Sequence, residues 1–199
     1  MSGDLFSQVL ILRGETLIYD SQEWKRELIR QKHFLNLYSK LRWTARRFNK
    51  YAHKIDLSFL VSAIIIRKLI ESDKLSDDAD NYKINVATYT PHKHIDKLHK
   101  WVEDGDYEWG DCQNSSVPAK TICNSLIHSY AYCPKFSEQY KLIGFFVASD
   151  FDRNKLIYEI ELSRWIEYIN FISSDSVCEV SMRFNEKKSD YISILKKRG

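Results

Sequence analysis

The chain has 199 residues, of which 44% are hydrophobic and 14% aromatic, and its formal net charge is only +3. This composition excludes a globally disordered chain, and six glycines with three prolines exclude the collagen-like and low-complexity classes. The length suits a single domain spanning residues 1–199. The chain starts without a basic and then apolar leader, and no run reaches the roughly 20 apolar residues of a membrane span. We therefore expect a cytoplasmic protein without membrane association.

The first part of the chain predicts long helices. Residues 9–12 and 16–19 are compatible with short strands or with a leading helix. From residue 23 to residue 52, apolar side chains recur every three or four positions, which predicts one long amphipathic helix or two joined near Asn36 or Asn49. Asp56 is predicted to cap a further helix that ends near Ser72 and is apolar nearly all round. A polar loop is expected over residues 73–81.

The middle of the chain mixes strand, helix and loop signals. Weak alternation over residues 82–90 predicts a strand, and the proline at position 91 predicts a short helix to residue 101. Glycines and small polar residues over 103–118 predict a loop. A helix is expected from Ala119 to about Tyr132, where Pro134 would stop it.

The C-terminal third carries the clearest strand patterns. Segments 142–148 and 155–161 predict a hairpin, residues 162–172 a helix, residues 177–184 a half-buried strand, and residues 187–198 a basic helix or a loose tail. We therefore predict an α+β fold with a mainly helical core and a small antiparallel sheet in the C-terminal third. The helical part would span about 21–135, and the hairpin, helix and strand part about 140–185.

The small net charge hides two oppositely charged segments. Residues 23–54 contain ten basic and two acidic residues, whereas residues 71–111 contain eleven acidic residues and five lysines. A basic helix attracts phosphates, and interleaved aromatic rings stack unpaired bases if they are exposed. Alternatively, the basic segment is a solvated face, or it pairs with the acidic segment of the same or a neighbouring molecule. The candidate nucleic-acid-binding residues are Arg26, Arg30, Lys40, Arg46, Arg47, Lys54, Lys120 and Tyr130.

A short motif lies in the helix predicted after residue 119. Asn124, His128 and Tyr130 occupy the last three defined positions of the pattern R-N-x-x-x-H-x-Y, and Cys123 stands where the pattern has arginine. This stretch resembles the signature of the HEPN superfamily, helical proteins many of which are ribonucleases. The resemblance implies metal-independent RNA cleavage, with His128 and Asn124 as catalytic residues on one helix face. A thiol cannot hold a phosphate as arginine does, so the resemblance implies either an inactive relative or a cation borrowed from elsewhere, such as Lys120.

A second arginine–histidine spacing occurs earlier in the chain. Arg47 and His53 satisfy R-x₅-H, and Arg46 with His53 satisfies R-x₆-H. A charged helix end explains the same residues without chemistry. As a hypothesis, Arg46 or Arg47 serves His128 in the folded protein, which makes Arg47 the third candidate catalytic residue.

Cysteines and histidines raise the alternative of a zinc site. Cys112, Cys123, His128 and Cys133 lie in one stretch, shortly after three histidines at positions 92, 94 and 99. Structural zinc sites usually bring ligands in close pairs, which are missing here, so we expect reduced thiols, no metal and no other cofactor.

Two functions are compatible with these observations. The first is an intracellular HEPN-like protein that binds or cleaves RNA, a role that the resemblance links to bacterial defence and toxin systems. The second is a non-enzymatic subunit that assembles through charged helical surfaces, with a protein partner or a second copy of itself. The motifs of P-loop, dinucleotide-binding and serine-hydrolase proteins are missing from the sequence.

Overall fold

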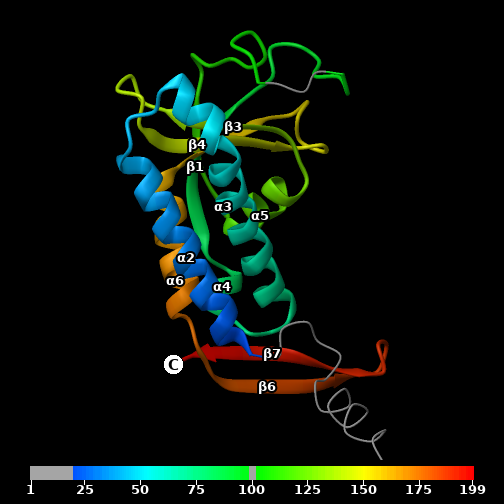
Figure 1. The fold of residues 1–199 in the computed structure, drawn as a ribbon. Coiled ribbons are helices and arrows are strands. Elements are labelled where there is room, and N and C mark those ends of the chain that lie inside the picture. Colours follow the sequence, from blue (N-terminus) through cyan, green and yellow to red (C-terminus); the bar gives the residue numbers. More distant parts are fainter. Residues whose placement is uncertain (1–19, 99–101) are drawn as a thin grey trace, which may run out of the picture.

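Helices and an antiparallel sheet contribute together to the fold of the computed structural model, which describes residues 20–98 and 102–199. Figure 1 shows α2 and α3 running beside the sheet and a separate hairpin at the far end from the α2–α3 corner. The short strands or leading helix considered for residues 9–12 and 16–19 lie outside the described residues.

Two long helices form the first half of the described chain. Helix α2 (Ser21–Lys40) begins at Asp20, whose carboxylate accepts a hydrogen bond of 2.8 Å from the backbone of Gln22. Helix α3 (Ala45–Glu71) begins at Thr44 and runs for 27 residues. The predicted break near Asn36 or Asn49 is therefore wrong, because the chain turns at residues 41–44. Asp56 lies inside α3 and caps nothing.

The main sheet has five antiparallel strands in the order β2-β1-β5-β4-β3. Strand β2 is an edge strand with four polar residues followed by Val117 and Pro118, and β3, the other edge strand, contains Pro134. The strands span β1 (Lys83–Tyr89), β2 (Gln113–Pro118), β3 (Ser129–Phe136), β4 (Leu142–Ser149) and β5 (Ile157–Glu161).

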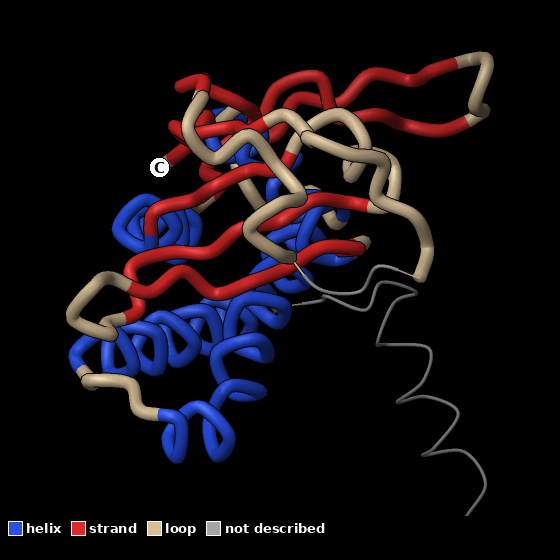
Figure 2. The backbone as a smooth tube through the Cα atoms, turned by 90° about the horizontal axis from the view of Figure 1, so that it is seen from above, coloured by secondary structure: helices blue, strands red, loops and turns tan. Residues whose placement is uncertain are grey.

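The two faces of the sheet are covered differently, because successive side chains of a strand point to opposite faces. One face packs against α2, α5 (Ala119–Ile127) and α6 (Leu162–Ser174), and α3 lies against α2 and α5. This face and the helices share the main core, in which Phe59 of α3 meets Phe145 of β4 at a ring-centre distance of 4.4 Å. A smaller apolar cluster with Ile95 and Tyr107 covers part of the other face. Figure 2 shows the strands between a helical layer and a layer of loops.

A second, two-stranded sheet projects from the end of α6. Strands β6 (Val177–Asn185) and β7 (Asp190–Arg198) pair only with each other among the described residues. The buried Asp175 fixes the base of this hairpin: its carboxylate accepts 2.7 and 2.6 Å bonds from the backbone and hydroxyl of Ser76, just before the short α4 (Asp77–Asp80). Its carbonyl oxygen accepts a bond from Lys25 of α2.

The predicted layout of a mainly helical core with a sheet confined to the C-terminal third is wrong, although the fold is α+β. Three of the five strands of the main sheet lie within or at the end of the predicted helical part, 21–135, in which only the strand over 82–90 is expected. Strand β2 falls in the expected loop, β3 in the expected end of a helix, and β7 in the expected basic tail. Residues 91–98 form no helix; Pro91 instead bridges to Tyr107.

Candidate functional site

His128 and Asn124 lie together, as their spacing on the predicted helix requires. Both line a cavity of about 620 Å³ at the C-terminal end of α5, and His128 is exposed. The other lining residues include Thr121, Asp150 and Asp152. No lysine or arginine is among the described residues that line it. The cavity therefore offers an imidazole and an amide, but the charged groups that line it are the acids Asp150, which pairs with Arg153, and Asp152, and neither attracts phosphate.

The arginine position of the motif is sealed inside the core. Cys123 is fully buried, and burial raises the pKa of its thiol to about 12. The charge of Arg67 opposes the rise in the Cys123 pKa, but the Arg67 guanidinium already pairs with Glu71 at 2.8 Å. The expected substitute, Lys120, pairs with Asp80 at 2.9 Å. Neither cation is therefore free to serve His128.

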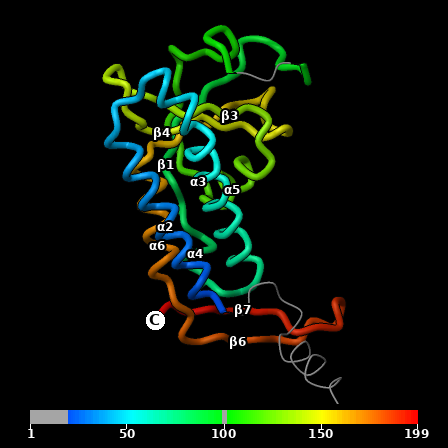
Figure 3. The backbone as a smooth tube through the Cα atoms, in the orientation of Figure 1, coloured from blue at the N-terminus to red at the C-terminus, as the bar shows by residue number. Residues whose placement is uncertain are grey.

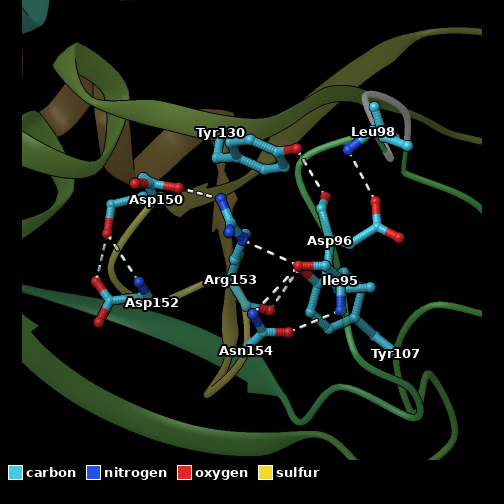
Figure 4. A network of polar contacts seen from close by, with 10 residues as sticks. Ile95, Asp96, Leu98, Tyr107, Tyr130, Asp150, Asp152, Arg153 and Asn154 are labelled. Carbon is cyan, nitrogen blue, oxygen red and sulfur yellow. Dashed lines mark hydrogen bonds and ion pairs between the residues drawn. The ribbon is translucent and has the colours of Figure 1, made fainter.

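Tyr130, the last residue of the motif, takes part in a structural network. Its hydroxyl donates a 2.7 Å bond to the carbonyl oxygen of Asp96, and the guanidinium of Arg153 lies 4.1 Å from its ring centre. Arg153 also pairs with Asp150 and donates a 3.0 Å bond to the carbonyl oxygen of Ile95 (Figure 4). The network fastens the loop after β1 to the turn between β4 and β5.

Arg47, the third candidate catalytic residue, lies in the first turn of α3. Its guanidinium donates a 2.5 Å bond to the carbonyl oxygen of Arg42. The groove lined by Arg42 and the cavity lined by His128 have no lining residue in common. The structure thus brings Asn124 to His128, and it shows no contact between Arg47 and His128.

His53, the partner of Arg47 in the second spacing, lines a different cavity of about 250 Å³ between α3, α5 and β3. Asp56 and Tyr132 line it as well, together with the apolar side chains of Leu57, Leu60 and Leu126. Burial raises the pKa of Asp56, while Tyr132 and His53 oppose that shift. This carboxyl group is therefore easier to protonate than an ordinary aspartate.

A cluster of cations surrounds the α2–α3 corner, and we call it the basic surface. Its members are all exposed, and within the described chain none of them forms an ion pair with an acid. By helical spacing, residues 46, 47, 50 and 54 share one side of α3. Lys50 and Lys54 lie 5.1 and 5.4 Å from the ring centre of Tyr51. The basic surface consists of Lys40, Arg42, Arg46, Arg47, Lys50 and Lys54.

The predicted nucleic-acid-binding residues Arg26 and Arg30 lie outside the basic surface, and both form ion pairs. Arg26 pairs with Glu23, and Arg30 pairs with Glu27 at 2.7 Å, both within α2.

The acids of segment 71–111 do not neutralise the basic surface. They pair instead with cations outside it, among them Lys196 with Asp73, Lys120 with Asp80 and Lys93 with Asp106. The intramolecular pairing of the two charged segments is therefore not found in the described residues.

The sequence reasoning missed an aromatic groove beside the basic surface. The groove has a volume of about 510 Å³ and lies between the α2–α3 corner and the turn from β3 to β4. No local pattern identifies it, because its walls come from segments about ninety residues apart. Its lining residues are Arg42, Trp43, Thr44, Ala45, Phe48, Phe136 and Tyr140.

The candidate ligands of the alternative zinc site are dispersed. Across the described residues, no three histidine, cysteine or acidic side chains are close enough to hold a metal ion. Cys112 is exposed, Cys133 is half-buried, and the ring of His92 contacts Glu108. His99 lies outside the described residues.

None of the described helices is both long enough and apolar enough to cross a membrane. Comparisons with protein-family models, with curated proteins and with solved structures found no match for this chain.

Proposed function

We propose that the protein binds single-stranded RNA along the basic surface. The observation that carries the proposal is that six exposed cations lie together at one corner of the molecule without acidic partners in the described chain. Unpaired cations along a helix concentrate phosphates and release their counterions on binding. The first turn of α3 adds no acid, so the positive end of its dipole reinforces the field.

Fluorescence anisotropy with an end-labelled single-stranded RNA of about 12 nucleotides tests the proposal. The variant R46E/R47E/K50E removes three phosphate contacts. We expect it to lose most of the affinity at low salt and to reduce the slope of log affinity against log salt by about 2.

The matched control is R183E/K187E/K188E, which changes the net charge equally on the exposed β6–β7 hairpin. This control should bind almost as the wild type does. If the wild-type protein binds no RNA at about 50 mM salt, or if both triple variants lose affinity equally, the basic surface is not an RNA site.

The proposal concerns binding, and cleavage by His128 stays a prediction. The exposed imidazole and its neighbour Asn124 favour it, whereas the acids of the same cavity and the buried Cys123 count against it. Gel electrophoresis of the RNA after the binding titration tests it directly. RNA shortened by the wild type and left intact by H128A would support cleavage, whereas RNA left intact by both would contradict it.

Assembly into a larger complex is the second candidate function. The hairpin of β6 and β7 favours it, because exposed apolar side chains line both of its strands. They are Val180, Met182, Phe184, Tyr191, Ile194 and Leu195. Contiguous exposed apolar side chains are typical of protein interaction sites.

A further inference from the structure

The aromatic groove is walled by rings from two distant parts of the chain. Figure 3 shows the α2–α3 corner next to the turn that joins β3 to β4. Phe136 lies 5.7 Å from Trp43 and 6.1 Å from Phe48, measured between ring centres. Phe48 and Tyr140 are 42% and 57% exposed, so both rings present surface to a ligand.

Tyr140 occupies a backbone conformation that favours glycine. Its φ angle is 58°, in the left-handed region that bulky side chains rarely adopt. Backbone hydrogen bonds hold the turn on both sides of Tyr140. The Tyr140 N–H donates a 2.8 Å hydrogen bond to the carbonyl oxygen of Ser137, and the Tyr140 carbonyl oxygen accepts a 2.7 Å hydrogen bond from the Trp43 N–H. A strained residue whose side chain is mostly exposed contributes little to the core, and such strain is concentrated at ligand-binding positions.

The charges around the groove are positive. Arg42 lines the groove, and its guanidinium lies 5.9 Å from the Tyr140 ring centre. The guanidinium of Arg47 reaches the carbonyl oxygen of Arg42, at the same rim. No acid is among the described lining residues. The groove therefore combines flat apolar walls with cations, which complements an aromatic ring that carries a phosphate.

We propose that this groove holds one unpaired base of the bound RNA, stacked on Tyr140 and Phe48, with the adjoining phosphate at Arg42 and Arg47. The inference rests on the proposed RNA binding and adds a contact that ignores base identity, because every base has a stacking face. It predicts that part of the affinity depends on bases and the rest on phosphates.

Two RNAs of the same length separate these parts: an end-labelled adenine oligomer of about 12 nucleotides and its abasic counterpart with the same phosphates. The wild type should bind the adenine oligomer about tenfold more tightly than the abasic one. The variants Y140G and F48A should remove most of that difference and leave the affinity for the abasic oligomer and the salt dependence unchanged.

Tyr140→Gly also separates binding from folding. Glycine relieves the strained φ angle, so the melting temperature should stay the same or rise by a few degrees. The matched control is Ser189→Gly, which relieves a φ of 50° in the β6–β7 turn and should leave RNA binding unchanged.

The possible failures are distinguishable. If the wild type binds both oligomers equally, or if Y140G and F48A bind the adenine oligomer as the wild type does, the base groove is overturned while the basic surface stands. If the wild type binds neither oligomer at low salt, the proposed function fails and the base groove with it.

Discussion

Cys123 shows how burial decides what a motif position can do. It replaces the arginine of the R-N-x-x-x-H-x-Y pattern, and its side chain is completely enclosed by the core. A guanidinium at this position would have to be buried without the solvation it needs. The local spacing correctly predicted that Asn124 and His128 share a cavity, but it does not reveal which side of α5 faces the core and which faces water.

The same burial predicts an order of thiol reactivity. Because the thiolate is the reactive form, a thiol whose pKa is about 12 and which solvent cannot reach is inert at neutral pH. We expect Cys112 and Cys178, both exposed, to react rapidly with 5,5′-dithiobis(2-nitrobenzoic acid), Cys133 more slowly, and Cys123 only after unfolding. Absorbance at the wavelength of the released thiolate measures each phase. Rapid labelling of a fourth thiol in the folded protein would contradict the buried position of Cys123.

Elements whose apolar residues recur with a period, even as weakly as over residues 82–90, were predictable from the sequence, and elements without such a period were not. The strand over 82–90, the hairpin at 142–161, the helix over 162–172 and the strand over 177–184 correspond to β1, β4 with β5, α6 and β6. The prediction that the last of these strands is half-buried is wrong, because the alternating apolar side chains of β6 are exposed. The first four residues of β2 are exposed and polar, and only Val117 packs against the core, so the strand shows no alternation. The lysines near the end of β7 interrupt its apolar alternation, so the strand was not predicted. The aromatic groove depends on a contact between Tyr140 and Trp43, which no sequence period encodes.

Asp175 joins elements that are far apart in the chain, because it contacts Ser76, Lys25 and Arg198. Asp175→Ala leaves the hydroxyl and the N–H of Ser76 buried without an acceptor, so we expect a loss of about 3 kcal/mol in the free energy of unfolding. Urea unfolding followed by circular dichroism measures this loss. Asp78→Ala, at an exposed position in α4, is the control and should change stability by less than about 0.5 kcal/mol.

At the scale of the molecule, charge is segregated rather than balanced. The acids of segment 71–111 pair with cations such as Lys196 and Lys120, and they leave the basic surface at the opposite end of α3 without partners in the described chain. A net charge of +3 gives no sign of this arrangement. Binding of a polyanion at the α2–α3 corner therefore needs no rearrangement of the internal ion pairs.

The projecting hairpin makes a separate prediction about assembly. If its exposed apolar side chains form an interface between copies, light scattering after size-exclusion chromatography should show a mass that rises with protein concentration. The variant F184D/Y191D, which charges an exposed cross-strand aromatic pair, should remain monomeric. A wild type that is monomeric at every concentration up to its solubility limit would rule out this interface.

The edges of the two sheets differ in their ability to accept another strand. Strand β2 is short and ends in Pro118, and β3 carries Pro134. Because a proline has no N–H to donate, the five-stranded sheet is poorly suited to backbone pairing with a neighbour at these positions. Strands β6 and β7 are each nine residues long without a proline. The outer edge of β7 is partly occupied, because the Lys196 N–H donates a 3.0 Å hydrogen bond to Asp77, whereas β6 has one side without a neighbouring strand in the described chain. Extension by β-augmentation, whether by a partner peptide or by aggregation of partly unfolded copies, would therefore begin at the hairpin.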